Sequence, residues 1–167
     1  MVEYKTKYFG SFFMSNDVEK YLVGKIKLNE TFQFVNIKLV DCYQYYDKID
    51  KCVKIVDEYY KINQIGKKAI IKNHKDNGII KDYLNNNFII SDDFIFVKDL
   101  WEDDYKESKK YTINELLEEI CPAGDIDIFY ENNQFFIVIA YSLIIESDET
   151  IMVEMDKNLK IKGIEII

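Results

Sequence analysis

The chain has 167 residues, and its 22 basic residues are all lysine, with a single histidine and a single proline. Arginine makes the commonest specific contact to guanine and grips phosphate bidentately, while histidine supplies most proton transfer near neutral pH. The composition therefore disfavours sequence-specific nucleic-acid binding and the usual forms of acid–base catalysis. An AT-rich genome would favour lysine over arginine in the same way without any functional pressure.

Length and hydropathy predict one globular domain spanning residues 1–167. Hydrophobic residues make up 48% of the chain, which is ample for a core. The first ten residues lack the apolar core of a signal peptide, and no apolar run reaches the roughly 18 residues of a membrane span. Cys42, Cys52 and Cys121 have no metal-binding spacing and are typical of reduced thiols. We expect a cytoplasmic protein without a membrane segment.

Charge is divided unevenly along the chain. Residues 1–90 carry 15 lysines and 11 acidic residues, whereas residues 91–156 carry 4 lysines and 18 acidic residues. Such a segment would repel the phosphates of nucleic acid and would attract and orient a basic protein partner. The alternative, which stays open at this point, is that the lysine-rich region 48–75 neutralises the acidic segment within the fold.

Residues 2–41 show the two-residue alternation of strands. Tyr4, Tyr8 and Phe12 mark a first strand, and residues 21–28 and 32–39 form a second and a third around a turn at Asn29-Glu30. We expect a three-stranded meander at the N-terminus.

Residues 47–86 change to helical spacing. Asp47 is a candidate cap for a helix whose apolar positions are Ile49, Cys52, Val53, Val56 and Tyr60. A second helix is predicted over 64–75, ending at the Asp-Asn-Gly sequence of residues 76–78, and a short third helix over 79–85.

The remaining residues predict mainly strands. Phe94–Lys98 is an expected strand, residues 101–110 a polar loop, and Thr112 with Glu115 fits the capping box of a helix that Pro122 would end. Four strands joined by short turns then follow, at 125–131, 134–145, 150–156 and 159–167. The fold class is α+β: an N-terminal three-stranded and a C-terminal four-stranded antiparallel meander, with two to four helices packed on one face. The pattern leaves open whether the two meanders form one sheet.

Few residues indicate chemistry. His74 falls at a helix end, where interaction with the last carbonyls explains it better than catalysis. Asp125 and Asp127 would share one strand face, a pattern that suits either a hard cation or an exposed strand start, and we favour the second interpretation. Phosphate-loop, dinucleotide, zinc-protease and nucleophile-elbow motifs do not occur. We expect no catalytic residue, cofactor or metal.

A partner-binding patch is the strongest functional candidate. The only tryptophan lies among acidic residues, and aromatic side chains dominate binding hot spots while carboxylates orient a cationic partner. The alternative is a solvated loop whose tryptophan packs back onto the core. The candidate patch comprises Asp92, Asp93, Trp101, Glu102, Asp103, Asp104 and Tyr105.

The order of features resembles a bacterial family of small cytoplasmic α+β proteins of unknown function. The resembling segments are Tyr8–Gly10, Asp50–Tyr60, Ile126–Ile128, Tyr141–Leu143, Ile151–Glu154 and Asp156–Leu159. The resemblance implies no catalytic or binding residue, because the family has no established activity. Its members are similar to the immunity proteins of bacterial toxin systems, being small, acidic and without enzyme motifs.

Three functions are therefore weighed. We favour a non-catalytic binding protein of the immunity type that neutralises a basic toxin. The second is an enzyme with a carboxylate or metal site at Asp125, Asp127 and either Glu146 or Glu154. The third is a homo-oligomeric structural protein that pairs through its apolar C-terminal strand, 159–167.

Overall fold

The fold is given by a computed structural model. It describes residues 3–6, 11–14, 21–28, 31–40, 46–76, 78–91, 94–97, 110–112, 115, 121–142 and 149–167. The helices are α1 (Tyr46–Val56), α2 (Tyr59–Lys75) and α3 (Ile79–Asn87). The strands are β1 (Glu3–Lys5), β2 (Ser11–Met14), β3 (Tyr21–Leu28), β4 (Thr31–Val40), β5 (Phe88–Ser91), β6 (Phe94–Val97), β7 (Lys110–Tyr111), β8 (Cys121–Glu131), β9 (Gln134–Ser142), β10 (Ile151–Asp156) and β11 (Ile161–Ile166).

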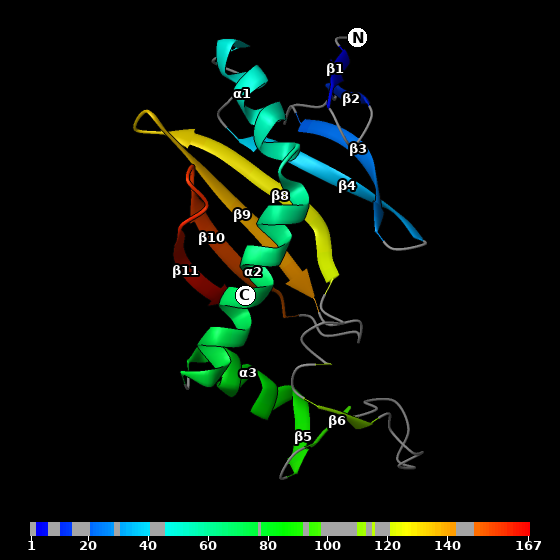
Figure 1. Ribbon diagram of the computed structural model, residues 1–167, viewed down its shortest axis with the longest axis vertical. Coiled ribbons are helices and arrows are strands. Elements are labelled where there is room, and N and C mark those ends of the chain that lie inside the picture. Colours follow the sequence, from blue (N-terminus) through cyan, green and yellow to red (C-terminus); the bar gives the residue numbers. More distant parts are fainter. Residues whose placement is uncertain are drawn as a thin grey trace.

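Eight strands form one sheet in the order β1-β2-β3-β4-β8-β9-β10-β11. The C-terminal strands β8 to β11 are antiparallel neighbours, which confirms the predicted four-stranded arrangement. The two halves of the sheet meet where β4 pairs with β8, and this pair is parallel. A parallel pair requires a long crossover, and the chain between β4 and β8 contains α1, α2 and α3 (Figure 1). The sheet is therefore mixed, whereas the sequence predicted antiparallel strands alone.

The N-terminal part of the sheet differs from the predicted three strands. In place of one first strand through Tyr4, Tyr8 and Phe12, β1 and β2 are separate strands that pair antiparallel with each other. β2 then pairs with β3, and β3 with β4 over Tyr21–Leu28. A chain reversal between β1 and β2 cannot be recognised from alternation, because both strands keep the same period.

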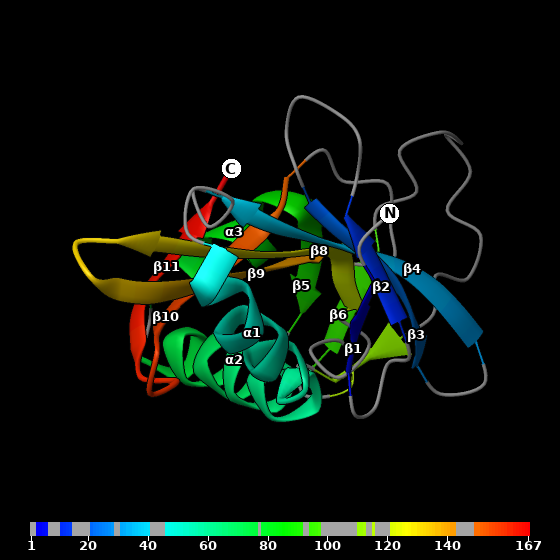
Figure 2. The ribbon, with the colours of Figure 1, turned by 90° about the horizontal axis from the view of Figure 1, so that it is seen from above.

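Two helices cover one face of the sheet. In Figure 2 α1 and α2 lie on the same side of the strands, whereas Figure 1 places α3 beyond the end of the sheet, next to β5 and β6. Strands β5, β6 and β7 form a second, three-stranded sheet. Its strand β7 begins at Lys110, within the predicted polar loop. The core lies between α1–α3 and the inward side chains of β8, β9 and β10.

The helical period predicts the buried face of α1 but not the transition to α2. Ile49, Cys52, Val53 and Val56 are buried as expected. A turn at residues 57–58 then interrupts the helix, with the Glu58 amide donating to the Ile55 carbonyl at 3.0 Å. The interruption shifts the phase by one residue, so that Tyr59 is fully buried and Tyr60 is 49% exposed. The prediction of Tyr60 as a core residue was therefore wrong.

Most of the turns and caps that the sequence predicts between helices and strands are confirmed. The α2 helix ends at Lys75, as residues 76–78 predict, and the β8–β9 turn has positive φ at Asn132 and Asn133. Thr112 and Glu115 form the reciprocal capping box: the Thr112 amide donates to the Glu115 carboxylate at 2.8 Å, and the Glu115 amide to the Thr112 hydroxyl at 3.3 Å. The helix expected after that box lies outside the described residues. Pro122 lies inside β8, beside a shift in the β8–β9 register.

The helix layer and the sheet make a close contact at Tyr141. Its hydroxyl is buried beneath α2 and donates to the Asn63 carbonyl at 3.1 Å. Gly66 leaves the space for this ring, because a Cβ at that position would lie 2.1 Å from the Tyr141 oxygen. Burial, and to a lesser degree the neighbouring Tyr59, raises the pKa of Tyr141, so this hydroxyl stays a donor.

We predict that Gly66→Ala destabilises the protein. Alanine favours a helix interior by about 1 kcal/mol over glycine, but forcing a methyl group into a filled space costs about 1–3 kcal/mol. The expected result is a lower free energy of unfolding in urea, despite the better helix former. Gly163→Ala is the matched control, since a Cβ there meets nothing within 4 Å. Equal stability of the two variants would contradict the close contact.

Candidate functional site

The predicted partner-binding patch cannot be placed on the structure. Asp92 and Asp93 come between β5 and β6 in the chain, and Trp101 to Tyr105 between β6 and β7, and all seven residues lie outside the described residues. The candidate site is therefore built from the acidic and basic residues that the structure does describe.

The acidic strands place their described carboxylates on the side of the sheet away from the helices. Asp127 lies between the buried residues Ile126 and Ile128, and Glu154 between the buried Val153 and Met155. Because side chains alternate across a strand, these carboxylates point to the opposite face. We call this the helix-distal face. Among its described residues are Asp127, Phe129, Phe136, Val138, Ala140, Met152, Glu154, Asp156 and Glu165, and Lys162 lies against Asp156.

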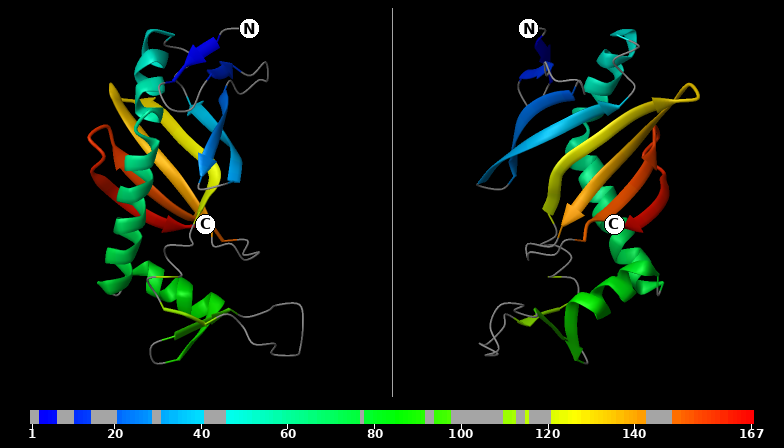
Figure 3. Two further views of the ribbon diagram at one scale, coloured as in Figure 1. Left: turned by 45° about the vertical axis from the view of Figure 1, so that its right-hand side comes forward. Right: turned by 180° about the vertical axis from the view of Figure 1, so that it is seen from behind.

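No helix lies in front of this face when the molecule is seen from behind (Figure 3, right). The strand register arranges its side chains in rows. Asp127, Val138 and Glu154 are consecutive partners on β8, β9 and β10. In the next row the rings of Phe129 and Phe136 stack with centroids 5.9 Å apart. The face thus combines carboxylates with a half-buried aromatic pair.

The lysines of the helices lie on the other side of the sheet. Lys61 of α2 pairs with Glu58, the residue that precedes this helix, at 2.9 Å. The Lys48 amine lies 5.8 Å from the ring centre of Tyr130, which faces the helices. Glu154 is separated from these lysines by the sheet itself. The open alternative, that helical lysines neutralise the acidic strands, is therefore disfavoured for Glu154. On the β4 side of the face, the register sets Lys38 beside Asp127.

Asp156 has a structural role on this face. Its Oδ1 accepts from the Asn158 amide at 2.8 Å and from the Lys160 amide at 3.0 Å, and its Oδ2 lies 3.9 Å from the Lys162 amine. These contacts hold the β10–β11 turn, in which Leu159 has a φ of 61°. The amide of Lys160, followed by that of Asn158 and the charges of Lys162 and Lys160, lowers the pKa of Asp156.

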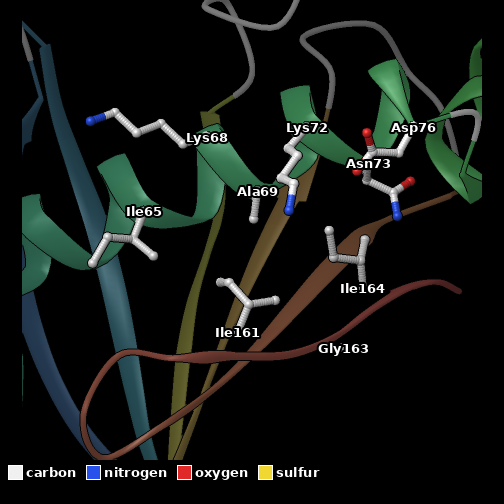
Figure 4. A pocket seen from close by; sticks show the side chains of 9 residues that line it. All are labelled: Ile65, Lys68, Ala69, Lys72, Asn73, Asp76, Ile161, Gly163 and Ile164. Carbon is white, nitrogen blue, oxygen red and sulfur yellow. The ribbon is translucent and has the colours of Figure 1, made fainter.

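A groove on the helix side lies between α2 and β11, where the sheet ends. Its volume is about 500 Å³. Ile65 and Ala69 line it from α2, and Ile161 and Ile164 from β11. Figure 4 shows Lys72 reaching down from the helix toward the gap, while Asn73 and Asp76 close one end. We call this space the edge groove; its remaining lining residues are Lys68 and Gly163.

The remaining titratable candidates have local explanations. His74 lies in the last turn of α2, as predicted, and burial together with Lys81 and Lys75 lowers its pKa. Cys52 is a buried cysteine in α1. Asp125 and Asp127 both belong to β8, and Val138 stands between Asp127 and Glu154 in the register. Within the described part of the chain, no group of three or more His, Cys, Asp or Glu side chains could hold a metal ion.

Comparison of the chain with family models, with curated proteins and with solved structures finds no match. Among the described helices, none is long and apolar enough to cross a membrane.

Sequence reasoning missed both surfaces that the structure defines. The alternation of Ile126 to Phe129 carried a signal for the helix-distal face, because charged and aromatic residues there alternate with isoleucine. The edge groove had no comparable signal. It exists only because α2 passes over a strand that follows it by almost a hundred residues.

We predict that the contribution of Asp156 to stability depends on pH. Its pKa in the folded chain lies below the ordinary value of 3.8. The stabilisation is therefore present above pH 3.8 and is lost as the pH falls through the lowered value. In urea unfolding, Asp156→Asn should be less stable than the natural chain at about pH 7, and the difference should close toward about pH 2.

Lys162→Met is the comparison variant for this prediction. It removes the ion pair and keeps both backbone hydrogen bonds, which are Asp156's shorter contacts. It should therefore reproduce only part of the difference. A difference that is constant over the whole pH range would contradict the assigned role of Asp156.

Proposed function

We propose that this protein is a non-catalytic binding domain that takes a basic protein partner on its acidic side, in the manner of an immunity protein that neutralises a toxin in the cytoplasm. The single observation that supports this proposal is the position of Glu154 and Glu165 on the helix-distal face, opposite the lysine-rich helices.

The chemistry of that face suits a cationic partner. Glu154 and Glu165 present carboxylates on neighbouring strands, and the stacked pair Phe129 and Phe136 offers apolar surface beside them. Carboxylates around an aromatic contact orient a lysine- or arginine-rich surface and speed its approach, while burial of the aromatic rings supplies affinity. Residues 112–156 contain 11 acidic residues and no lysine, so the electrostatic potential of this whole segment is negative as well.

The patch around Trp101 belongs to the same proposal. Asp92, Asp93 and residues 101–105 come from the same acidic stretch of sequence as β8 and β10. They would bring a tryptophan and a tyrosine to the contact with the partner, and these residue types dominate binding hot spots.

The test is co-purification with the basic product of a neighbouring gene, followed by measurement of affinity at rising salt. Attraction between exposed charges is screened by salt, so the affinity should fall as ionic strength rises. The absence of a complex with any neighbouring product, or a complex whose affinity is insensitive to salt, would contradict a charge-steered partner.

A charge reversal locates the contact. We predict that Glu154→Lys weakens binding by about tenfold or more, equal to about 1.4 kcal/mol, because it places a positive charge in the centre of the acidic face. Asp50→Lys on the exposed side of α1 changes the net charge equally and should leave affinity nearly unchanged. Equal weakening by the two variants would show that net charge alone matters and would remove the helix-distal face as the site.

A further inference from the structure

The strand β11 ends the eight-stranded sheet, and its outer side has no partner among the described strands. Thr150 and Ile167 exchange both backbone hydrogen bonds, at 2.7 and 3.0 Å. In an antiparallel pair such doubly bonded positions alternate with positions whose amide and carbonyl point outward. Ile166 is one residue from Ile167 and Ile164 is three residues from it, so both occupy outward positions. Their amide and carbonyl groups therefore point away from β10. These groups can accept a further strand.

The side chains next to this edge are unusually apolar. Ile164 and Ile166 are half-buried against the core and Ile167 is 66% exposed. Exposed edge strands are commonly protected by lysine, by bulges or by short length. Here a register irregularity between Glu154 and Met155 and the exposed Lys162 protect only the first part of β11. Residues 163–167 contain neither device, and the helices α2 and α3 both contact β11.

The edge groove runs beside this strand. An added strand on β11 would place every second side chain over the groove, next to Ile161 and Ile164. On the α2 side, the groove is lined by Lys68 and Lys72, which are exposed and lie one helical turn apart. Figure 4 shows the Lys72 amine on the groove side of the helix. Asp76 is the one acidic lining residue and lies at the end where α2 stops.

We propose that the edge groove binds an extended acidic segment of another protein, which pairs with β11 as a ninth strand and sets its carboxylates against Lys68 and Lys72. Main-chain hydrogen bonds at Ile164 and Ile166 supply affinity, and the two lysines select acidic side chains. This site lies on another part of the molecule from the helix-distal face and has the opposite charge. An experiment can therefore contradict one of the two proposals and leave the other intact.

The charges favour an acidic strand over a second copy of this chain. Antiparallel pairing of two β11 strands in one continuous sheet puts both α2 helices on the same side of that sheet. Lys68 and Lys72 of the two copies would then flank one seam and repel each other. A foreign strand with carboxylates on that side neutralises the same lysines.

The test uses a fluorescent eight-residue peptide of alternating valine and glutamate, with an alternating valine–lysine peptide for comparison. Anisotropy titration of the full chain at low salt should show the glutamate peptide binding about tenfold or more tightly than the lysine peptide. Backbone amide NMR shifts should change at Ile164 and Ile166. A lack of binding up to about 1 mM, equal binding of both peptides, or shifts confined to other elements would overturn the proposal.

Two pairs of variants separate the contributions. Lys68→Glu with Lys72→Glu should abolish the preference for glutamate, whereas Lys51→Glu with Lys54→Glu, exposed on α1 outside the groove, should retain it. Ile164→Pro removes an outward amide without touching the β10 ladder and should abolish binding, whereas Ile164→Val should keep it. The lysine variants alter only exposed side chains, so they decide the question even where Ile164→Pro fails to fold.

Light scattering tests the alternative that β11 pairs with a second copy of this chain. Light scattering that shows a dimer, converted to a monomer by Ile164→Pro, would assign β11 to self-association and overturn the proposed acidic strand. A monomer that binds the glutamate peptide would support it.

Discussion

The hydroxyl of Tyr141 lies against the backbone of α2, where Gly66 has no side chain and the Asn63 carbonyl accepts its hydrogen bond at 3.1 Å. This contact fixes how closely the long helix approaches the sheet. The buried residues of β9 and β10, among them Ile139 and Val153, pack under the same helix. A wider spacing would leave voids around them, since protein cores are close-packed. The position of α2 over the sheet, and hence of the edge groove, follows from this close approach.

The helix layer also divides the molecule electrostatically. Buried isoleucines fill the face of β8–β10 under the helices, so the charged residues of those strands must lie on the other face. Lys68 and Lys72 stay on the helix side, and Glu154 and Glu165 on the opposite side. The sheet thus separates these two lysines from these two glutamates.

The parallel pairing of β4 with β8 decides the location of both surfaces. It joins the N-terminal strands to one side of β8 and leaves β11 as the opposite edge. If β4 had instead paired with β11, the edge groove would be filled by the sheet and Ile164 would have a partner. The same pairing sets Lys38 beside Asp127 at the centre of the sheet, which moves the most acidic part of the helix-distal face toward β10 and β11.

The sequence by itself determined the local elements: the buried stripe Ile49 to Val56, the capping box at Thr112, the asparagine turn between β8 and β9, and the four C-terminal strands. These depend on periodicity and turn chemistry within a few residues. Only the tertiary structure decided the parallel β4–β8 pair, the burial of Tyr59 in place of Tyr60, and the groove between α2 and β11. Each of these depends on contacts between distant segments or on a one-residue phase shift, and neither leaves a periodic trace in the chain.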